Sequence, residues 1–273
     1  MTLGGESRTP RSQKFVRLLR AAVASPITVT RALPGEFRQR YGNEQYLESQ
    51  VADDFHEQLH SLLGVPWPCR EISRLDELMA DIRALLEARG LGFGRGTYGW
   101  YADADRLFCR AVWCTVLHNR PEVVIETGVA HGVTSRIVLE ALARNDLGHL
   151  WSIDLPFPFD RGLHTQTGAA VTDTCRRRWS YLEGSSRKRL PPLVAEVGHV
   201  EVFIHDSLHT ARNTAFEAGQ VARAMPPGSV MVIDDIRMHN GFAIFARRHP
   251  DFQTIVGRHD DRMGMFGIAV KRD

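Results

Sequence analysis

The sequence has few cysteines, no surplus of either charge and no long apolar run, and each absence excludes a class of protein. Four cysteines in 273 residues, with no C-x-x-C pair, give neither a disulfide framework nor the spacing of a zinc finger. They are Cys69, Cys109, Cys114 and Cys175. We interpret Cys109 and Cys114 as reduced residues of the core, because they lie in an apolar stretch with helical spacing.

The balance of charge gives no basis for binding nucleic acid or an anionic membrane, since 34 basic and 32 acidic side chains leave a net charge of +2. The first apolar stretch, from Phe15 to Thr30, is interrupted by arginines and a proline. It therefore fits neither a secretion signal nor a membrane span. We expect a cytoplasmic protein that has no nucleic-acid or membrane partner.

The N-terminal part of the chain is predicted to be helical. The spacing of apolar residues indicates amphipathic helices at Lys14–Ala24, Glu44–Leu63 and Ile72–Arg89. Between Gly92 and Tyr101, glycines alternate with aromatic residues, which predicts a loop that either approaches a ligand or simply connects two elements. We assign residues 1–100 to a tail and a helical extension, and residues 101–273 to the main domain. A homo-oligomer formed through the N-terminal helices is one hypothesis.

The main domain alternates buried strands with helices. The strands are expected at Val123–Ile125, Leu150–Asp154, Val200–Asp206 and Ser229–Asp235, with a shorter one before Gly184 and a final antiparallel pair at Phe252–Val256 and Met263–Val270. This alternation predicts an α/β fold, with a doubly wound, seven-stranded and mostly parallel sheet of the Rossmann-like kind. Ligands of such sheets bind outside the carboxyl ends of the strands. The acidic residues found at those ends are Glu126, Asp154, Asp206, Asp234 and Asp235.

A glycine turn follows the first of these strands. The segment G-V-A-H-G, from Gly128 to Gly132, precedes a helix expected over Arg136–Ala143, which Thr134 or Ser135 could cap. The turn lacks the G-x-G-x-x-G pattern of nicotinamide-binding proteins. An acid at its start, Glu126, would also repel a pyrophosphate, so the turn suits a ligand with a cationic or hydroxylated part.

The residues of this turn resemble a known family. The segments V-I-E-T-G-V-A-H-G-V-T-S, ending at Ser135, and W-S-I-D, ending at Asp154, resemble the first two motifs of class I S-adenosylmethionine-dependent methyltransferases. The resemblance covers residues ~120–270 and implies that the turn holds the amino-acid part of S-adenosylmethionine, Asp154 its ribose and Ser186 its adenine. Ser185 stands where the family usually has an acid. The cofactor-binding residues so implied are Glu126, Thr127, Gly128, Gly132, Ser135, Asp154, Ser186 and Asp206.

A second group of residues concerns the acceptor side of the reaction. Three carboxylates at neighbouring strand ends, Asp206, Asp234 and Asp235, would repel one another unless a cation compensates. Such oxygen ligands suit a divalent metal, with Mg²⁺ the expected ion. The D-x-x-H and D-D arrangement, with His209, resembles metal-dependent O-methyltransferases that act on macrolide sugars or tailor cephalosporins. That resemblance implies metal ligands at the three aspartates and catalytic roles for Asp206 and for His209, the general base.

The sequence therefore predicts an enzyme that methylates a hydroxyl oxygen of a small-molecule acceptor, with S-adenosylmethionine and a divalent metal as cofactors. A neutral His209 with a pKa near the working pH would take the hydroxyl proton. Alternatively, Asp206 contacts the cofactor only, Asp234 and Asp235 cap a helix, and His209 is a hydrogen-bonded core residue. Three other functions stay open: a metal-independent methyltransferase of the same fold, an NAD(P)-dependent oxidoreductase and a non-catalytic binding protein.

Overall fold

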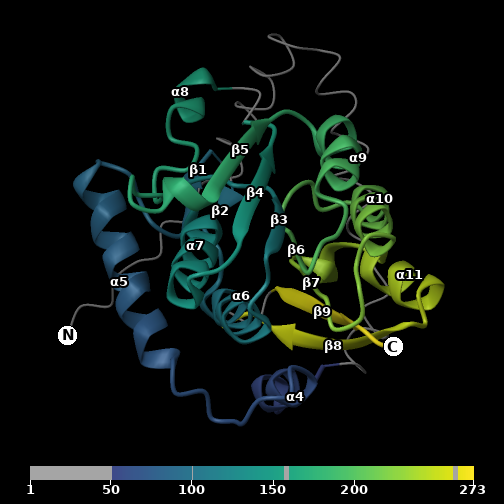
Figure 1. The fold of residues 1–273 in the computed structure, drawn as a ribbon. Helices are drawn as coiled ribbons and strands as arrows, with labels where there is room; N and C mark the ends of the chain where they lie inside the picture. The colour runs from purple at the N-terminus through teal and green to yellow at the C-terminus, as the bar shows by residue number, and fades with distance from the viewer. Residues whose placement is uncertain (1–50, 100, 157–159, 261–263) are drawn as a thin grey trace.

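The computed structural model of the chain describes residues 51–99, 101–156, 160–260 and 264–273 (Figure 1). The helix predicted at Lys14–Ala24 and the beginning of the one predicted from Glu44 lie outside these residues. Within them, no helix is both long and apolar enough to cross a lipid bilayer.

A seven-stranded sheet forms the centre of the molecule, with the strand order β5-β4-β3-β6-β7-β9-β8. Its strands are β3 (Val123–Thr127), β4 (His149–Asp154), β5 (Trp179–Glu183), β6 (Val202–His205), β7 (Val230–Ile233), β8 (Phe252–Arg258) and β9 (Met265–Lys271). The first five run parallel, whereas β9 is antiparallel to both of its neighbours. The predicted Rossmann-like sheet, seven-stranded and mostly parallel with an antiparallel final pair, is confirmed.

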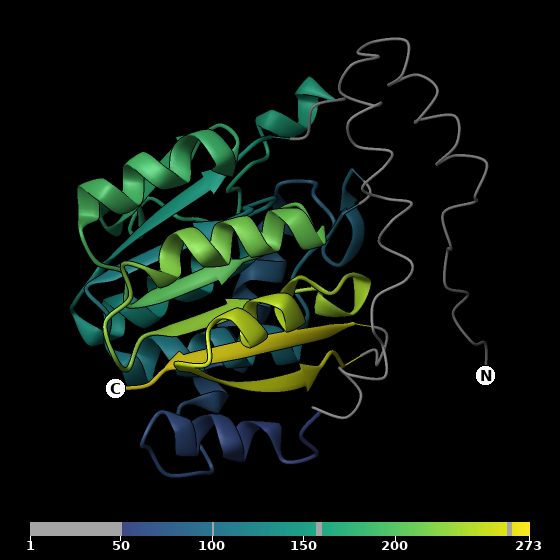
Figure 2. The ribbon, with the colours of Figure 1, turned by 90° about the vertical axis from the view of Figure 1, so that its right-hand side faces the viewer.

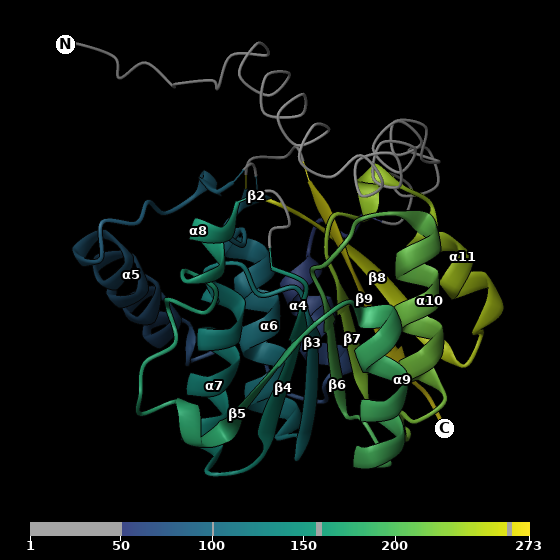
Figure 3. The ribbon, with the colours of Figure 1, turned by 90° about the horizontal axis from the view of Figure 1, so that it is seen from above.

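Helices cover both faces of this sheet. On one face lie α5 (Ile72–Ala88), α6 (Arg106–Asn119) and α7 (Val133–Asn145), and on the other lie α9 (Ser186–Val197), α10 (Ala211–Ala222) and α11 (Gly241–Arg248), as Figure 3 shows. Figure 2 shows the second set across the near face of the sheet. The shorter helices are α4 (Phe55–Leu62) and α8 (Arg161–His164), with 3₁₀ turns at Arg176–Arg178 and Ile236–Met238.

The β-branched residues of β3 explain its central position. Val124 packs into the hydrophobic cluster beneath α6 and α7, whereas Val123 and Ile125 pack into the cluster beneath α9 to α11. Successive side chains of a strand point to opposite faces, so a continuous apolar run fits a strand that is covered on both sides.

The two described N-terminal helices, α4 and α5, share the hydrophobic cluster of α6 and α7, through Leu59, Leu75 and Ile82. The predicted helix Glu44–Leu63 is wrong between Val51 and Asp54, because helix α4 begins only at Phe55. There the backbone pairs with the sheet instead: Val51 forms an isolated bridge with Val256, and the N–H of Ala52 donates to the carbonyl of Val256. Val51 and Ala52, which the helical spacing assigned to a helix, thus hydrogen-bond to the outer edge of β8 instead.

The glycine-rich stretch Gly92–Tyr101 is not a plain loop. It contains β1 (Arg95–Tyr98), which pairs with β2 (Tyr101–Ala102) in a small antiparallel sheet. The carboxylate of Asp103 holds this hairpin, since it accepts hydrogen bonds from the Gly94 N–H at 2.8 Å and the Thr97 hydroxyl at 3.0 Å. Short strands separated by glycines leave no alternating apolar pattern, which is why the sequence did not indicate them.

Candidate active site

The turn after β3 needs glycine at two positions. Gly128 and Gly132 have φ angles of +88° and +81°. A Cβ atom on Gly128 would lie 2.0 Å from the carbonyl oxygen of Asp206, and one on Gly132 would lie 2.9 Å from the Cα atom of Gly168. The turn is therefore packed against the end of β6 on one side and against the segment after α8 on the other.

Helix α7 begins earlier than expected. It starts at Val133 with Gly132 at the N-cap position, so the predicted start at Arg136 and the predicted cap at Thr134 or Ser135 are wrong. The reason lies in the hydroxyl of Ser135, which is buried and donates to the Glu126 carboxylate at 2.6 Å. The Ser135 hydroxyl thus hydrogen-bonds to the residue near the end of β3 and does not cap helix α7.

Glu126 is fully buried beneath the turn. Its Oε2 accepts hydrogen bonds from the hydroxyls of Ser135 and Ser152, both at 2.6 Å, while its Oε1 has no hydrogen-bond partner in the part of the chain that the structure describes. Burial raises the pKa of this carboxyl group to about 8, although the two serine hydrogen bonds oppose the shift. Its predicted contact with the cofactor stays a prediction.

The side chain of Thr127 points to a buried acid that the sequence analysis missed. Its hydroxyl donates to Glu217 of α10 at 2.7 Å, and Nδ1 of His205 lies 2.6 Å from the same carboxylate oxygen. Burial opposes ionisation, but His205 and the surrounding hydrogen-bond donors, Ser186 and Thr127 among them, hold the pKa of Glu217 at about 2. The signal that could have found Glu217 is its position as a lone acid on the buried face of helix α10.

From Glu217, hydrogen bonds continue through the core to His239. The Thr214 hydroxyl lies 2.9 Å from Nε2 of His205 and 3.2 Å from Nε2 of His239. The Gly241 N–H donates to Nδ1 of His239 at 3.0 Å, so the proton of that ring sits on Nε2, facing Thr214. Burial, with His209 and His205 nearby, lowers the pKa of His239 to about 3. The predicted turn residue Thr127 is thus joined to α10 and α11 by one buried network.

Two predicted cofactor ligands lie at the ends of β4 and β5. Asp154 is half-buried at the last position of β4, and its carboxylate accepts a hydrogen bond from the backbone of Ala130 in the glycine turn. Burial raises its pKa to about 6, and the charge of Asp206 adds to the shift. Ser186 opens α9, directly after β5 and Gly184, and its hydroxyl also faces Glu217. The turn and the strand-end acid are therefore neighbours, as the motif spacing predicted.

His209 lies between two of the predicted metal ligands. Its Nδ1 is 3.0 Å from Oδ2 of Asp235, and its Nε2 is 3.4 Å from Oδ1 of Asp206. Burial acts to lower the pKa of His209, but the carboxylates of Asp235 and Asp206 outweigh it and raise the pKa well above the usual value. The neutral imidazole expected from the sequence is thus wrong for this arrangement, because two carboxylates stabilise the imidazolium.

The third predicted ligand, Asp234, pairs with a histidine that the sequence analysis did not select. Its Oδ1 lies 2.8 Å from Nε2 of His259, and ligand atoms of Asp234, Asp235 and His259 lie within 4.8 Å of one another. Burial raises the pKa of Asp234 to about 6 against the effect of His259. Because β9 is antiparallel to β7, the turn between β8 and β9 returns to the carboxyl end of β7, and this topology could have indicated His259.

The hairpin β1-β2 and the segment after α8 close over the glycine turn. His131, inside the turn, is fully buried, and its Nδ1 lies 3.2 Å from the Asp103 carboxylate. The backbone N–H groups of Gly168 and Ala170 donate to the carbonyls of Ala130 and His131. His131 therefore links the hairpin to the turn.

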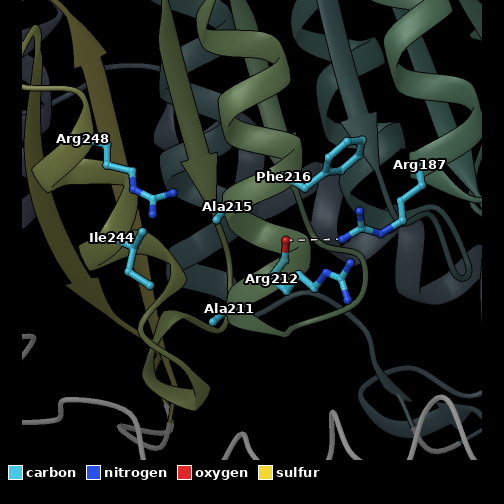
Figure 4. A pocket seen from close by; sticks show the side chains of 7 residues that line it. All are labelled: Arg187, Ala211, Arg212, Ala215, Phe216, Ile244 and Arg248. Carbon is cyan, nitrogen blue, oxygen red and sulfur yellow. Dashed lines mark hydrogen bonds between the residues drawn. The ribbon is translucent and has the colours of Figure 1, made fainter.

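A separate groove of about 410 Å³ lies over α9, α10 and α11 (Figure 4). Its lining consists of Arg187, Ala211, Arg212, Ala215, Phe216, Ile244 and Arg248. The Arg187 guanidinium lies 4.5 Å from the centre of the Phe216 ring and faces the backbone carbonyl of Arg212. None of the predicted site residues lines this groove, so the carboxylates of the strand ends form a distinct site.

Comparisons with known proteins agree with this geometry. Residues 125–236 match a family model described as a methyltransferase domain. Among solved structures, the chain is similar to an O-methyltransferase from Bacillus cereus in complex with SAH, at a TM-score of 0.52 and 13% identity, covering 82% of this chain and 100% of the other. It is also similar to the O-methyltransferase TomG from Streptomyces achromogenes, which is involved in tomaymycin synthesis and was solved in complex with SAM. Here the TM-score is 0.53 and the sequence identity 14%, over 83% of this chain and 99% of the other.

A methyltransferase from Geobacter sulfurreducens gives a TM-score of 0.50 at 15% identity, covering 81% of this chain and 98% of the other. No curated protein sequence matches the chain. At these identities the solved structures establish the fold alone, and the family model matches residues 125–236 of it.

Proposed function

We propose that this chain is an S-adenosylmethionine-dependent methyltransferase of the class I fold, which methylates a hydroxyl oxygen of a small molecule with the help of a divalent cation. The observation that carries this proposal is the position of His209, whose two ring nitrogens face Asp206 and Asp235 beside the glycine turn. A residue that can exchange a proton therefore lies next to the turn assigned to the methyl donor.

The residues around the turn fit S-adenosylmethionine. Glu126 offers a buried carboxylate oxygen without a hydrogen-bond partner among the described residues, directly beneath the segment assigned to the cationic part of the cofactor. Asp154 offers a half-buried carboxylate for two ribose hydroxyls. The bound cofactor supplies a methyl group on a sulfonium centre, which an oxygen nucleophile can attack. The protein contributes mainly by holding the two reactants in register, an effect that can be worth several kcal/mol.

The acidic residues fit a divalent cation. Asp234 and Asp235 are consecutive, and with His259 their ligand atoms lie within 4.8 Å of one another. Asp206 could supply a further oxygen, because His209 already links it to Asp235. A bound cation would stabilise the developing negative charge of the acceptor oxygen and help to orient it. Both His209 and His259 face these carboxylates, so the cluster favours positive charge, as a site for a cation requires.

His209 is proposed as the group that accepts the hydroxyl proton. Asp235 fixes one ring nitrogen at 3.0 Å, which orients the imidazole as carboxylates do in other catalytic sites. The base must be neutral before the transfer. A positive charge shared by Asp206 and Asp235 would weaken their hold on the imidazolium and return the pKa of His209 towards its usual value.

A metal-independent methyltransferase is the second candidate. The contact of His209 with Asp235 favours it, because the carboxylate orients the imidazole without a metal ion. An imidazole oriented by a carboxylate is sufficient for general-base catalysis in many enzymes. The oxidoreductase hypothesis loses support, because the turn lacks the third glycine and the matched family model describes a methyltransferase domain. Sugars and other natural products remain the proposed acceptors, and the cytoplasm the proposed location, since all four cysteines are free.

The experiment that tests the proposal measures S-adenosylhomocysteine formation with a panel of hydroxyl-bearing sugars and natural products. Activity should depend on an added divalent ion and disappear with a chelator. His209→Ala should lower kcat by about 10²–10⁴ while calorimetry shows unchanged S-adenosylmethionine affinity. Full activity in the presence of a chelator would select the metal-independent candidate. An active His209→Ala enzyme would disprove the assignment of the base.

A further inference from the structure

A second cluster of metal-binding side chains lies outside the candidate active site. The ligand atoms of His60, Cys69, Cys114 and His118 all lie within 4.8 Å of one another. His60 comes from α4, Cys69 from the connection between α4 and α5, and Cys114 and His118 from α6. Cys114 and His118 are four residues apart, so they project from the same face of their helix. No zinc-finger spacing marks the cluster in the sequence, because three separate segments assemble it.

The orientation of His60 is the observation that points to a metal ion. The residue is fully buried, and its Nδ1 lies 2.6 Å from the backbone carbonyl of His56. Only a protonated Nδ1 can donate to a carbonyl, so Nε2 carries the lone pair. That nitrogen is buried and faces the thiol of Cys69, another member of the cluster, without a hydrogen bond of good geometry to any residue that the structure describes. Histidines that bind metals through one nitrogen usually donate the other N–H to a carbonyl in this way.

The sulfur atoms are arranged to complete the same site. Sγ of Cys69 lies 3.3 Å from Nε2 of His118 and also accepts a hydrogen bond from the backbone N–H of Glu71. Cys114 is fully buried beside them. A tetrahedral zinc ion, with bonds of about 2.3 Å to sulfur and about 2.0 Å to nitrogen, keeps its ligand atoms roughly 3.3–3.8 Å apart. The cluster needs only small side-chain shifts to reach those distances.

We propose that His60, Cys69, Cys114 and His118 bind a structural zinc ion that fastens the helical N-terminal region to the methyltransferase domain. The donor set of two thiolates and two imidazoles is the one that zinc prefers, and it leaves no coordination position for a substrate. The ion joins α4 and the following connection to α6, the helix that packs against β6 and β7. It thereby adds metal–ligand bonds to the apolar packing and to the ion pairs of Arg106 with Asp76 and of Arg144 with Glu71, which also hold this region.

The zinc site is independent of the proposed chemistry. Helix α6 begins beside the acidic site, where the Asp105 carboxylate accepts a hydrogen bond from the backbone of Asp260. Its last residues, His118 among them, lie near the start of β3 at the opposite edge of the sheet. A helix of 14 residues is about 20 Å long, which separates the two sites. Zinc at this cluster would therefore remain bound even if the proposed function failed.

The test is the metal content of the full chain, purified without a histidine tag and dialysed, with zinc measured by mass spectrometry. We expect stoichiometric zinc in the wild type, in Asp235→Asn and in Cys109→Ala. Cys109 is the matched control, because it is buried in the same helix but points away from the cluster. Cys69→Ser and Cys114→Ser should lose the zinc, and removal of zinc from the wild type should lower its melting temperature.

Because the cysteine variants could also fail to fold, a second measurement uses the wild type alone. Cobalt(II) exchanged into the site should give the intense d–d absorption of a tetrahedral ion and a thiolate-to-cobalt charge-transfer band. Three results would overturn the proposal: wild-type protein that contains no zinc and takes up no cobalt, cysteine variants that keep their zinc, or thiol titration that reveals a disulfide between Cys69 and Cys114.

Discussion

Gly128 lies directly against the backbone of Asp206, so that a Cβ atom on Gly128 would stand 2.0 Å from the Asp206 carbonyl oxygen. The two strands that end directly before these residues, β3 and β6, are hydrogen-bonded neighbours, and the Asp206 N–H donates to the Thr127 carbonyl at 2.8 Å. The turn assigned to the methyl donor and the acid assigned to the acceptor side thus share one backbone contact. A change in the backbone position of Gly128 or of Asp206 should therefore displace the other residue as well.

Replacing Gly128 with alanine tests this coupling. The left-handed φ of +88° costs an alanine about 1–2 kcal/mol, and the contact with Asp206 forces the backbone of one strand end to move. We expect Gly128→Ala to lower the free energy of unfolding by about 3 kcal/mol or more, as measured by urea denaturation. Calorimetry should also show weaker binding of S-adenosylmethionine.

The control is Gly228→Ala, because Gly228 has a similar φ of +84° but a Cβ atom added there would meet nothing within 4 Å. It should cost only the strain of the left-handed backbone, about 1–2 kcal/mol, and leave cofactor binding unchanged. Equal losses in the two variants would mean that backbone strain alone accounts for the effect and that the contact with Asp206 is unimportant.

The buried carboxylate of Glu217 predicts a pH-dependent contribution to stability. Its pKa of about 2 in the folded protein is below the ordinary 4.5, so its contribution is complete above pH 4.5 and is lost as the pH falls through 2. Glu217→Gln should therefore lower the free energy of unfolding by about 3 kcal/mol at pH 7, and by less at pH 3. Urea denaturation at the two pH values measures the difference.

The exposed Glu196 of α9 provides the control, and Glu196→Gln should leave the stability near that of the wild type at both pH values. A Glu217→Gln variant that loses the same free energy at pH 3 as at pH 7 would show that the charge of Glu217 does not stabilise the fold.

The strands and the glycine turn could be predicted from the sequence because their signals are local. The run Val123–Ile125 reveals a strand buried on both faces, and Gly128 and Asp154 occur at a spacing that the fold requires. The predicted members of the site, from Glu126 to Asp235, do gather at one edge of the sheet. Their individual hydrogen bonds could not be predicted, since Ser135 and Thr127 bond to groups brought near by other segments.

The residues that the sequence analysis missed are those whose environment depends on contacts between distant segments. Glu217 and His259 lie in a helix and a turn that carry no motif, and only the packing of α10 and β9 brings them to the site. The same holds for Cys69 and Cys114, which are 45 positions apart in the chain and adjacent in the fold. A pattern within one segment cannot encode such a contact.

The buried acid at the end of β3 leads to a further prediction. Burial raises the pKa of Glu126 to about 8, so between pH 4.5 and 8 the folded protein holds a proton that the unfolded chain has lost, and the free energy of unfolding falls as the pH rises. Glu126→Gln removes this penalty. From pH 5 to pH 9 the wild type should lose on the order of 3 kcal/mol relative to the variant.

The same residue allows a test of the cofactor assignment. A cationic amino group bound near Glu126 would lower its pKa, so S-adenosylmethionine binding at pH 7 should release a proton. Calorimetry in buffers of different ionisation enthalpy measures that proton. Glu126→Gln should bind the cofactor more weakly and release none, whereas Glu122→Gln, on the exposed residue before β3, should behave as the wild type. If Glu126→Gln released the same number of protons and bound the cofactor with the same affinity as the wild type, Glu126 would not contact the cofactor. Its role would then be to accept the hydrogen bonds of Ser135 and Ser152.

The identity of the third ligand at the acidic site decides which metal the enzyme prefers. If Asp206 joins Asp234 and Asp235, all the protein ligands are oxygens and Mg²⁺ should give the highest activity. If His259 is the third ligand, the imidazole favours Mn²⁺ or another transition metal over Mg²⁺.

The test measures the activity of each variant as a function of the concentration of each ion. His259→Asn should change the order in which the enzyme prefers the ions only in the second case. In the first case His259→Asn should keep the preference for Mg²⁺, and Asp206→Asn should raise the Mg²⁺ concentration needed for half-maximal activity by about tenfold or more. An enzyme whose metal requirement is unaffected by both variants would have its cation elsewhere, and the carboxylates of β6 and β7 would then serve only to orient His209.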